Sequence, residues 1–517
     1  MPLSLREKAA GLLIVRLGSN MRPPRTAETD ADGVARLLDR HPLGGVILFN
    51  GRWPETRQTL CDLQARSDRG LLVTTDMERG AGQQVAGATL YPHLAAFGVE
   101  EDPDAVRAFA EQSAREALAC GIHVAYGPVA DVDREPRNPI IGTRAFGHTP
   151  ALVARLVRAY IEGARAAGLL TTAKHFPGHG GTADDSHATL PVLEDTAEAL
   201  AAQDLPPFEA ALAAGVDLVM TAHVAYPALD PSGRPATASA PILRGLLRER
   251  LGFTGAVVSD SLHMAGIKND ARAEADVAAD LLAAGVDLFV DAEDPLALIE
   301  GLARAVEAGR LDEALLDAAW QRAEALRERL RARFGAGVFR DPSCAYAPAE
   351  VGRAEHGALA HAVARRALRV AAGPVPDFGE GEGLLVVLVK PAPRPNEPET
   401  MPLGQAVARL LPRARYAELE PSEETDDAAF ERVLAEARAA ERLVVATIVR
   451  PAAWHAFGLA ARERRFVRAL MELRPTTLAV LGGPRGLMDL DAAQAALVAY
   501  SDVPASQVAL AERLAGR

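Results

Sequence analysis

Eight short runs of β-branched and aliphatic residues, separated by helical patterns, dominate the N-terminal two thirds of the chain. A representative helical pattern lies between the fourth and fifth runs, where Leu152, Leu156 and Tyr160 recur at helical spacing before Gly168 ends it. Eight strands alternating with helices over about 300 residues predict an α/β chain with a (β/α)₈ TIM-type barrel, and a doubly wound parallel sheet is the alternative. The runs are 12–18, 44–49, 71–76, 123–129, 170–176, 217–223, 256–260 and 287–291.

The rest of the chain predicts a second domain, since 517 residues are too many for one hydrophobic core. Glycine and proline interrupt the barrel pattern in the stretch FGAGVFRDPSCAYAPAE. We therefore expect a barrel over 1–335, a linker over 336–350 and a smaller C-terminal α/β sandwich domain over 351–517. The Pro-rich segment 391–399 is expected to be an exposed loop. The predicted helices of this domain lie near 355–371, 425–440 and 459–474, and its apolar runs are 384–389, 443–449, 477–482 and 496–500.

Polar residues stand where several of the eight runs end. Asp76 closes the third run, and Lys174 and His175 close the fifth. His223 closes the sixth run and Asp260 the seventh. Any one of them could serve as a strand cap or turn residue. Because barrel enzymes work at the C-terminal ends of their strands, the five together indicate a functional site.

The segment KHFPGHGGTADDSH, residues 174–187, holds three of the twelve histidines and two aspartates on a loop rich in glycine. Histidine and aspartate are ligands for zinc or iron, but no HxH or HExxH pair is present. Proton transfer is the other chemistry, in which Asp185 orients His187 so that the imidazole acts as general acid and base. A purely structural, hydrogen-bonded loop is the third interpretation.

The segment DREPRNPIIGTRAFG, residues 133–147, follows the fourth run. Its X-Pro pairs stiffen the loop that carries Arg144. The guanidinium could hold an oxygen-rich ligand with its fork of donors, or it could pair with a neighbouring carboxylate.

Three segments, KHFPGHGGTADDSH, NPIIGTRAFG and GFTGAVVSDSLHM, together resemble glycoside hydrolase family 3, and most closely its bacterial β-N-acetylhexosaminidase branch. The resemblance covers the barrel from near residue 5 to 335. The C-terminal part, with its late VAYSDVPASQ, is similar to the second domain of the two-domain members.

The resemblance implies specific roles. Asp260 matches the catalytic nucleophile, and Asp185 and His187 match the dyad that supplies acid/base catalysis in this branch. A retaining glycosidase attacks the anomeric carbon with a carboxylate, protonates the leaving oxygen, and then activates water. Asp76, Arg144, Lys174 and His175 match positions that hold the sugar hydroxyls, and His223 joins the expected substrate-binding set from its place at a strand end.

The sequence departs from the family pattern at three positions. After Asp76 the chain reads DMERGAGQQ, with Arg79 and Gln84 where the family often has a second glycine and a later arginine. This change puts one sugar contact in doubt. Ser261 follows Asp260 where relatives often carry a second aspartate.

The function expected from the resemblance is a retaining glycoside hydrolase that releases terminal non-reducing β-linked N-acetylglucosamine. A phosphorolytic enzyme of the same specificity is an alternative, because a neutral imidazole does not repel an anionic acceptor. A β-glucosidase or β-xylosidase is a second alternative, although those relatives usually take the acid/base from a glutamate outside this loop. A metal-dependent barrel hydrolase and a sugar-binding protein without catalysis complete the set.

Composition limits the partners. A net charge of −13 argues against nucleic acid and anionic membranes. No apolar stretch reaches the about 18 residues that span a bilayer, and the N-terminus lacks the pattern of a signal peptide. The isolated Cys61, Cys120 and Cys344 fit a reducing cytoplasm. We expect a small glycan substrate, such as a cell-wall fragment during recycling, with no cofactor and no metal.

Overall fold

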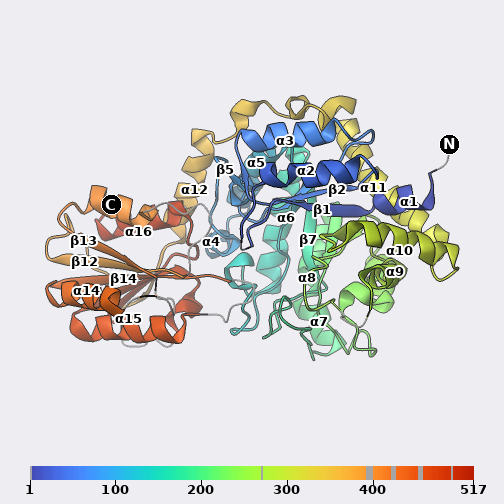
Figure 1. Cartoon of the computed structure of the whole chain (residues 1–517). Coiled ribbons are helices and arrows are strands. Elements are labelled where there is room, and N and C mark those ends of the chain that lie inside the picture. Colours follow the sequence, from blue (N-terminus) through green and yellow to red (C-terminus); the bar gives the residue numbers. More distant parts are fainter. Residues whose placement is uncertain are drawn as a thin grey trace. The chain divides into compact units, whose positions relative to one another are not determined.

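The computed structural model describes residues 3–517 apart from 22, 269–271, 392–399, 421–424, 426, 452–457, 489 and 491–492. The chain divides into two compact units (Figure 1). The first unit comprises 1–89, 102–138 and 148–356, and the second comprises 90–101, 139–147 and 357–517. Two short segments of the N-terminal part of the chain thus group with the C-terminal unit.

The first unit is built on an eight-stranded parallel sheet. Strand order is β10-β1-β2-β4-β6-β7-β8-β9, and a parallel bridge between Val258 and Leu288 joins the two outer strands. The sheet is therefore closed, which confirms the predicted barrel. Its strands are β1 (Leu13–Leu17), β2 (Gly45–Leu48), β4 (Leu72–Asp76), β6 (Val124–Tyr126), β7 (Leu170–Phe176), β8 (Leu218–Thr221), β9 (Ala256–Val258) and β10 (Phe289–Val290).

Helices follow the strands because glycine and proline end one element and begin the next. Helix α6 begins at Pro150 and ends before Gly168, whose φ of 93° suits a residue without a side chain. The strands are buried on both faces, as expected for a parallel sheet covered by helices. The helices of this unit are α1 (Leu5–Ala10), α2 (Ala27–Leu38), α3 (Glu55–Gln64), α5 (Pro103–Cys120), α6 (Pro150–Ala167), α7 (Ala197–Gln203), α8 (Leu205–Ala213), the π-helix η4 (Pro241–Arg250), α9 (Glu274–Ala284), α10 (Pro295–Glu307) and α11 (Glu313–Phe334).

The segment 336–350, expected as a linker, forms three short 3-10 helices in the first unit. These are η5 (Ala336–Phe339), η6 (Pro342–Cys344) and η7 (Pro348–Glu350). The ring of Phe339 lies 4.9 Å from that of His123, and Tyr346 Oη donates to the carbonyl of Ala167. The segment is thus packed against the base of the barrel.

The second unit is a three-layer α/β sandwich, as predicted. Its six-stranded sheet has the order β11-β16-β15-β14-β12-β13, and only the pairing of β11 with β16 is antiparallel. One face packs against α13 (Pro402–Leu410) and α16 (Pro504–Leu514), and the other against α14 (Asp427–Arg438) and α15 (Ala461–Leu473). The strands are β11 (Arg369–Ala372), β12 (Leu384–Val389), β13 (Arg415–Leu419), β14 (Arg442–Val449), β15 (Thr476–Gly482) and β16 (Ala495–Val498).

Short elements include the paired strands β3 (Gly51–Arg52) and β5 (Val85–Ala86) and the 3-10 helices η1 (Ala81–Gln83), η3 (Ala236–Ala238) and η8 (Pro484–Leu487). Helix α12 covers Ala354–Ala367, while α4 (Leu94–Glu100) and the 3-10 helix η2 (Gly142–Arg144) lie in the two segments that join the second unit. Most of the Pro-rich loop predicted at 391–399 lies outside the described residues. Within the part of the chain that the structure describes, no helix is long and apolar enough to cross a membrane.

Candidate active site

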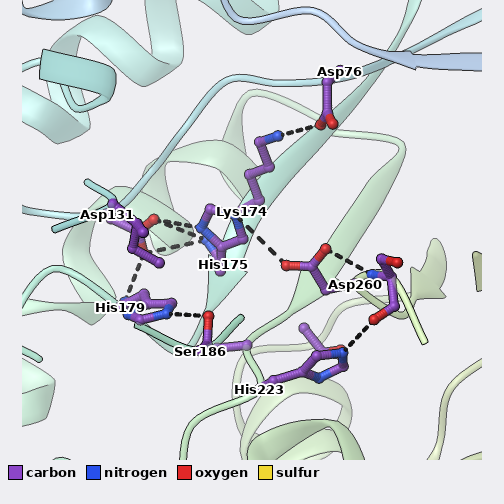
Figure 2. Close-up of polar contacts among 12 residues, drawn as sticks. Asp76, Asp131, Lys174, His175, His179, Ser186, His223 and Asp260 are labelled. Carbon is purple, nitrogen blue, oxygen red and sulfur yellow. Dashed lines mark hydrogen bonds and ion pairs between the residues drawn. The ribbon is translucent and has the colours of Figure 1, made fainter. Parts of the chain in front are cut away.

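Four of the predicted residues meet at the C-terminal ends of the barrel strands. Asp76 ends β4, Lys174 and His175 lie near the end of β7, and Asp260 follows β9 by two residues. Figure 2 shows Lys174 directed toward Asp76 and His175 lying between Asp131 and Asp260. Successive residues of a regular strand point to opposite faces, and a register break between Ala173 and Phe176 interrupts that alternation here.

Lys174 is a buried cation between two carboxylates. Its Nζ lies 2.7 Å from Asp76 Oδ1 and 2.9 Å from Glu78 Oε1. Glu78 is buried as well, whereas Asp76 is about one third exposed. A buried ammonium requires a partner, and the two carboxylates provide it for Lys174. The ion pair in turn orients the partly exposed side chain of Asp76.

His175 links Asp260 to a second, fully buried carboxylate. Its Nδ1 donates to Asp131 Oδ2 at 2.7 Å, and its Nε2 lies 4.0 Å from Asp260 Oδ2. Asp131 also accepts from the backbone N–H groups of His175 and His179. Burial raises the pKa of Asp131, but His175 and His179 outweigh it and hold the pKa below its usual range. Asp131 is therefore an anion that orients the His175 ring.

The side chain of Asp260 is an ionised carboxylate. Burial would raise its pKa, but the nearby His175, His223 and His187 and the backbone N–H of Ser261 lower it to about 2. Ser261 N donates to Asp260 Oδ1 at 2.7 Å. The side chain keeps 23% of its surface exposed. It is thus ionised at neutral pH and accessible to a ligand.

The dyad expected from the sequence is formed. His187 Nδ1 donates to Asp185 Oδ1 at 2.8 Å, and the backbone N–H of His187 donates to the same oxygen. The histidine side chain is 24% exposed. The bond to Asp185 places the proton of a neutral ring on Nδ1, so that Nε2 is the nitrogen that takes up and releases a proton.

Residues around the dyad hold its loop in place. His179 Nε2 lies 2.9 Å from Ser186 Oγ, and Figure 2 shows this contact beside Asp131. The backbone N–H groups of Ala265 and Gly266 donate to the carbonyls of His187 and Ser186. Since these two residues follow Asp260 in the chain, the loop is tied to the segment after Asp260.

His223 and Arg144 occupy different surroundings. His223 is 1% exposed, with Nδ1 2.7 Å from Thr237 Oγ1 and Nε2 donating to the carbonyl of Ser261 at 3.2 Å. Burial lowers the pKa of the ring, and the nearby Asp260 carboxylate opposes that effect. Arg144 belongs to the second unit, in η2, where its Nη1 donates to the carbonyl of Ile140. Substrate binding by either residue stays a prediction.

Sequence reasoning missed Asp131 and Glu78. Asp131 stands two residues beyond the fourth predicted run, and Glu78 stands two residues beyond the end of β4. The signal that singled out Asp76 was therefore present for both. At the departure from the family pattern, Gln84 Oε1 accepts from Asn20 Nδ2 at 2.9 Å. Among the described residues, no group of three or more His, Cys, Asp or Glu side chains could hold a metal ion.

Ionisable side chains gathered at the C-terminal ends of the strands are the arrangement found in barrel enzymes. Residues 4–326 match the N-terminal domain of glycosyl hydrolase family 3. The chain therefore belongs to glycoside hydrolase family 3, as the sequence motifs predicted.

The chain is also similar to individual proteins. It is 38% identical over 241 residues to a beta-hexosaminidase of Xylella fastidiosa, covering 45% of this chain and 71% of that protein. It is 36% identical over 274 residues to a beta-N-acetylglucosaminidase/beta-glucosidase of Cellulomonas fimi, covering 51% and 48%. A solved family 3 beta-N-acetylglucosaminidase from Paenibacillus sp. str. FPU-7 matches with a TM-score of 0.85 and 27% identity, covering 100% of this chain and 97% of that one.

Proposed function

We propose that this family 3 glycosidase releases terminal non-reducing β-linked N-acetylglucosamine by a retaining mechanism. The observation that carries the proposal is the His187–Asp185 bond on a loop tied to the segment that follows Asp260. An ionised carboxylate and an oriented imidazole are the two groups that such a mechanism needs. The N-acetylglucosamine specificity is supported by the names of the Xylella, Cellulomonas and Paenibacillus relatives.

In the first step, an Asp260 oxygen forms a bond to the anomeric carbon while the glycosidic C–O bond breaks. The imidazolium of His187 gives its Nε2 proton to the leaving oxygen. Asp185 stabilises this imidazolium, because its carboxylate accepts from Nδ1. Lys174 and Asp76 hold hydroxyls of the sugar, and Arg144 is a further proposed contact.

In the second step, water attacks the anomeric carbon and the bond to Asp260 breaks. His187 Nε2 accepts the proton of the water, and the free sugar leaves with its β-configuration retained. Phosphate in place of water would yield a sugar phosphate. Water is favoured because the relatives from Xylella and Paenibacillus carry the names of hydrolases. Assays with and without phosphate distinguish water from phosphate as the acceptor.

The central test is Asp260→Ala assayed with a panel of nitrophenyl glycosides, with and without phosphate. We expect the N-acetylglucosaminide to be the best substrate, and turnover by the variant to fall by at least about three orders of magnitude. A slow 5-fluoro sugar should leave an adduct on the peptide that contains Asp260. An adduct elsewhere, an inverted first product or an active, folded variant would overturn the proposal.

The dyad is tested by leaving-group dependence. His187→Ala should slow cleavage of a natural disaccharide by roughly 10²–10⁴-fold, because that leaving group needs a proton. The first step with dinitrophenol as leaving group should be nearly unaffected, and azide should then accelerate release of the sugar. Asp185→Asn should show a milder form of the same pattern. Equal slowing of all substrates would assign His187 a structural or binding role.

The biological substrate is proposed to be a cell-wall fragment processed in the cytoplasm. The three cysteines support this location, since all of them are free thiols in the structure. Incubation with muropeptides, followed by mass spectrometry of the released sugar, would test the substrate class.

A further inference from the structure

The backbone N–H, the carbonyl and the hydroxyl of Ser261, the residue after Asp260, each form a hydrogen bond. Its backbone N–H donates to Asp260 Oδ1 at 2.7 Å, and its carbonyl accepts from His223 Nε2 at 3.2 Å. Its hydroxyl donates to Asp291 Oδ2 at 2.7 Å. The bonds of the carbonyl and of the hydroxyl hold Ser261 from two sides, and the bond of the N–H reaches Asp260.

Asp291, the acceptor of the hydroxyl, is itself held firmly. It follows β10 with a φ of 63°, and its side chain is 2% exposed. Arg16 of β1 binds both of its oxygens, with Nε 2.7 Å from Oδ1 and Nη2 on Oδ2. His263 Nε2 lies 3.7 Å from Oδ1. The carboxylate is therefore oriented by a bidentate arginine from the neighbouring strand.

On the other side, His223 is buried and bonded to Thr237. The peptide of Ser261 is thus clamped between β1 and β10 on one side and the end of β8 on the other. The residue whose N–H donates to Asp260 is thus bonded on both sides. A donor fixed before the reaction needs no reorganisation when charge on the carboxylate changes.

We propose that Ser261, through Asp291 and Arg16, is a positioning residue that fixes the direction of the Asp260 carboxylate toward the anomeric carbon. The proposal rests on the proposed function, because it assigns Asp260 as the nucleophile. A hydroxyl can donate to Asp291, whereas an ionised carboxylate in its place would face Asp291 and Asp260 with like charge.

The first test compares Ser261→Ala with Ser259→Ala. Ser259 is the control, since it lies two residues earlier and its Oγ accepts from Val290 N, although it is fully buried whereas Ser261 is only partly buried. We expect S261A to slow formation of the fluoro-sugar adduct on Asp260 by at least about tenfold, with KM within about threefold of wild type. S259A should keep the wild-type rate, and Ser261→Thr, which retains the hydroxyl, should recover most of the loss.

The second test is the pH profile of kcat/KM. Ser261→Asp brings a third carboxylate beside Asp260 and Asp291, so the pKa of the nucleophile rises and the acid limb moves to higher pH. The double variant S261D/D291N should move that limb back. A structural role alone would lower the melting temperature without shifting the limb. If S261A does not fold, Ser261→Cys, which keeps the shape and weakens the donor, takes its place.

The outcomes separate the two proposals. Wild-type adduct rates and an unshifted acid limb in the Ser261 variants would overturn the positioning role. An adduct on a residue other than Asp260 in the wild-type enzyme would overturn the proposed function instead.

Discussion

Asp131→Asn would keep the size of a buried side chain and remove the charge that His175 and His179 face. The carboxylate accepts from His175 Nδ1 at 2.7 Å and from His179 N at 2.7 Å. Asparagine offers one acceptor oxygen, so at least one of these donors meets an N–H₂ group. A lost hydrogen bond to a charged group costs about 1.5–3 kcal/mol, and we expect unfolding free energy to fall by about 3 kcal/mol.

The same change should alter the pKa of Asp260, the proposed nucleophile. His175 contributes most to lowering the pKa of Asp260 against the effect of burial, and Asp131 holds the His175 ring in place through its Nδ1. In the variant the pKa of Asp260 rises from about 2 toward its ordinary value, and the acid limb of kcat/KM shifts upward. Misplacement of His175 by about 1 Å should add a loss on the order of 10²-fold in kcat.

The assay is nitrophenyl N-acetylglucosaminide turnover across pH, together with urea unfolding. Asp230→Asn serves as the control, because Asp230 is also buried and accepts from Ser239 Oγ and Ser232 N. It should lose stability with unchanged kcat. A folded D131N enzyme with wild-type kcat and acid limb would refute the role of Asp131.

Three further outcomes follow from the geometry. Activity should survive prolonged EDTA treatment, and a loss restored by zinc would favour a metal-dependent hydrolase. Burial, helped by Arg327, lowers the pKa of His123 to about 3 from an ordinary 6.5. The unfolded chain therefore binds more protons between these values, and unfolding free energy should fall with pH below 6.5 by up to about 1.4 kcal/mol per unit. Urea titrations at pH 5 and 7 should show a smaller difference in His123→Asn, and an equal difference would contradict this. Lys174→Met leaves the carboxylates of Asp76 and Glu78 without their shared cation. The free energy of unfolding in the same urea titration should fall by about 3–5 kcal/mol. An unchanged free energy of unfolding would show that the two carboxylates do not depend on Lys174.

The barrel could be predicted because its strands are buried on both faces. Such strands form continuous apolar runs, and all eight predicted runs contain a strand of the closed sheet. The edge strands of the second unit could not be found in the same way. β11 is exposed throughout, and β13 reads RYAEL, with only its last residue buried. Edge strands need no apolar run, so tertiary pairing alone reveals them.

The candidate site was predictable where chemistry coincided with a strand end. Asp76, Lys174, His175 and Asp260 met that condition, and the dyad came from a local motif. The roles of Asp131 and Ser261 depend on partners elsewhere in the chain, His175 and Asp291, and no local pattern pairs residues at such separations. The sequence could therefore draw attention to both positions, but only the structure shows which residues they bind.

The division of the chain into two units has a consequence for any attempt to cut it. The second unit takes Leu90–Glu101 and Pro139–Gly147 from the N-terminal part of the chain, and within it His93 N donates to Ser501 Oγ. A stop codon after His356 would remove Ser501 and leave both segments without the rest of the second unit. The gene has no single point at which it can be split into two self-sufficient products. A separable second unit would have to be built as a fusion that carries those two segments with it.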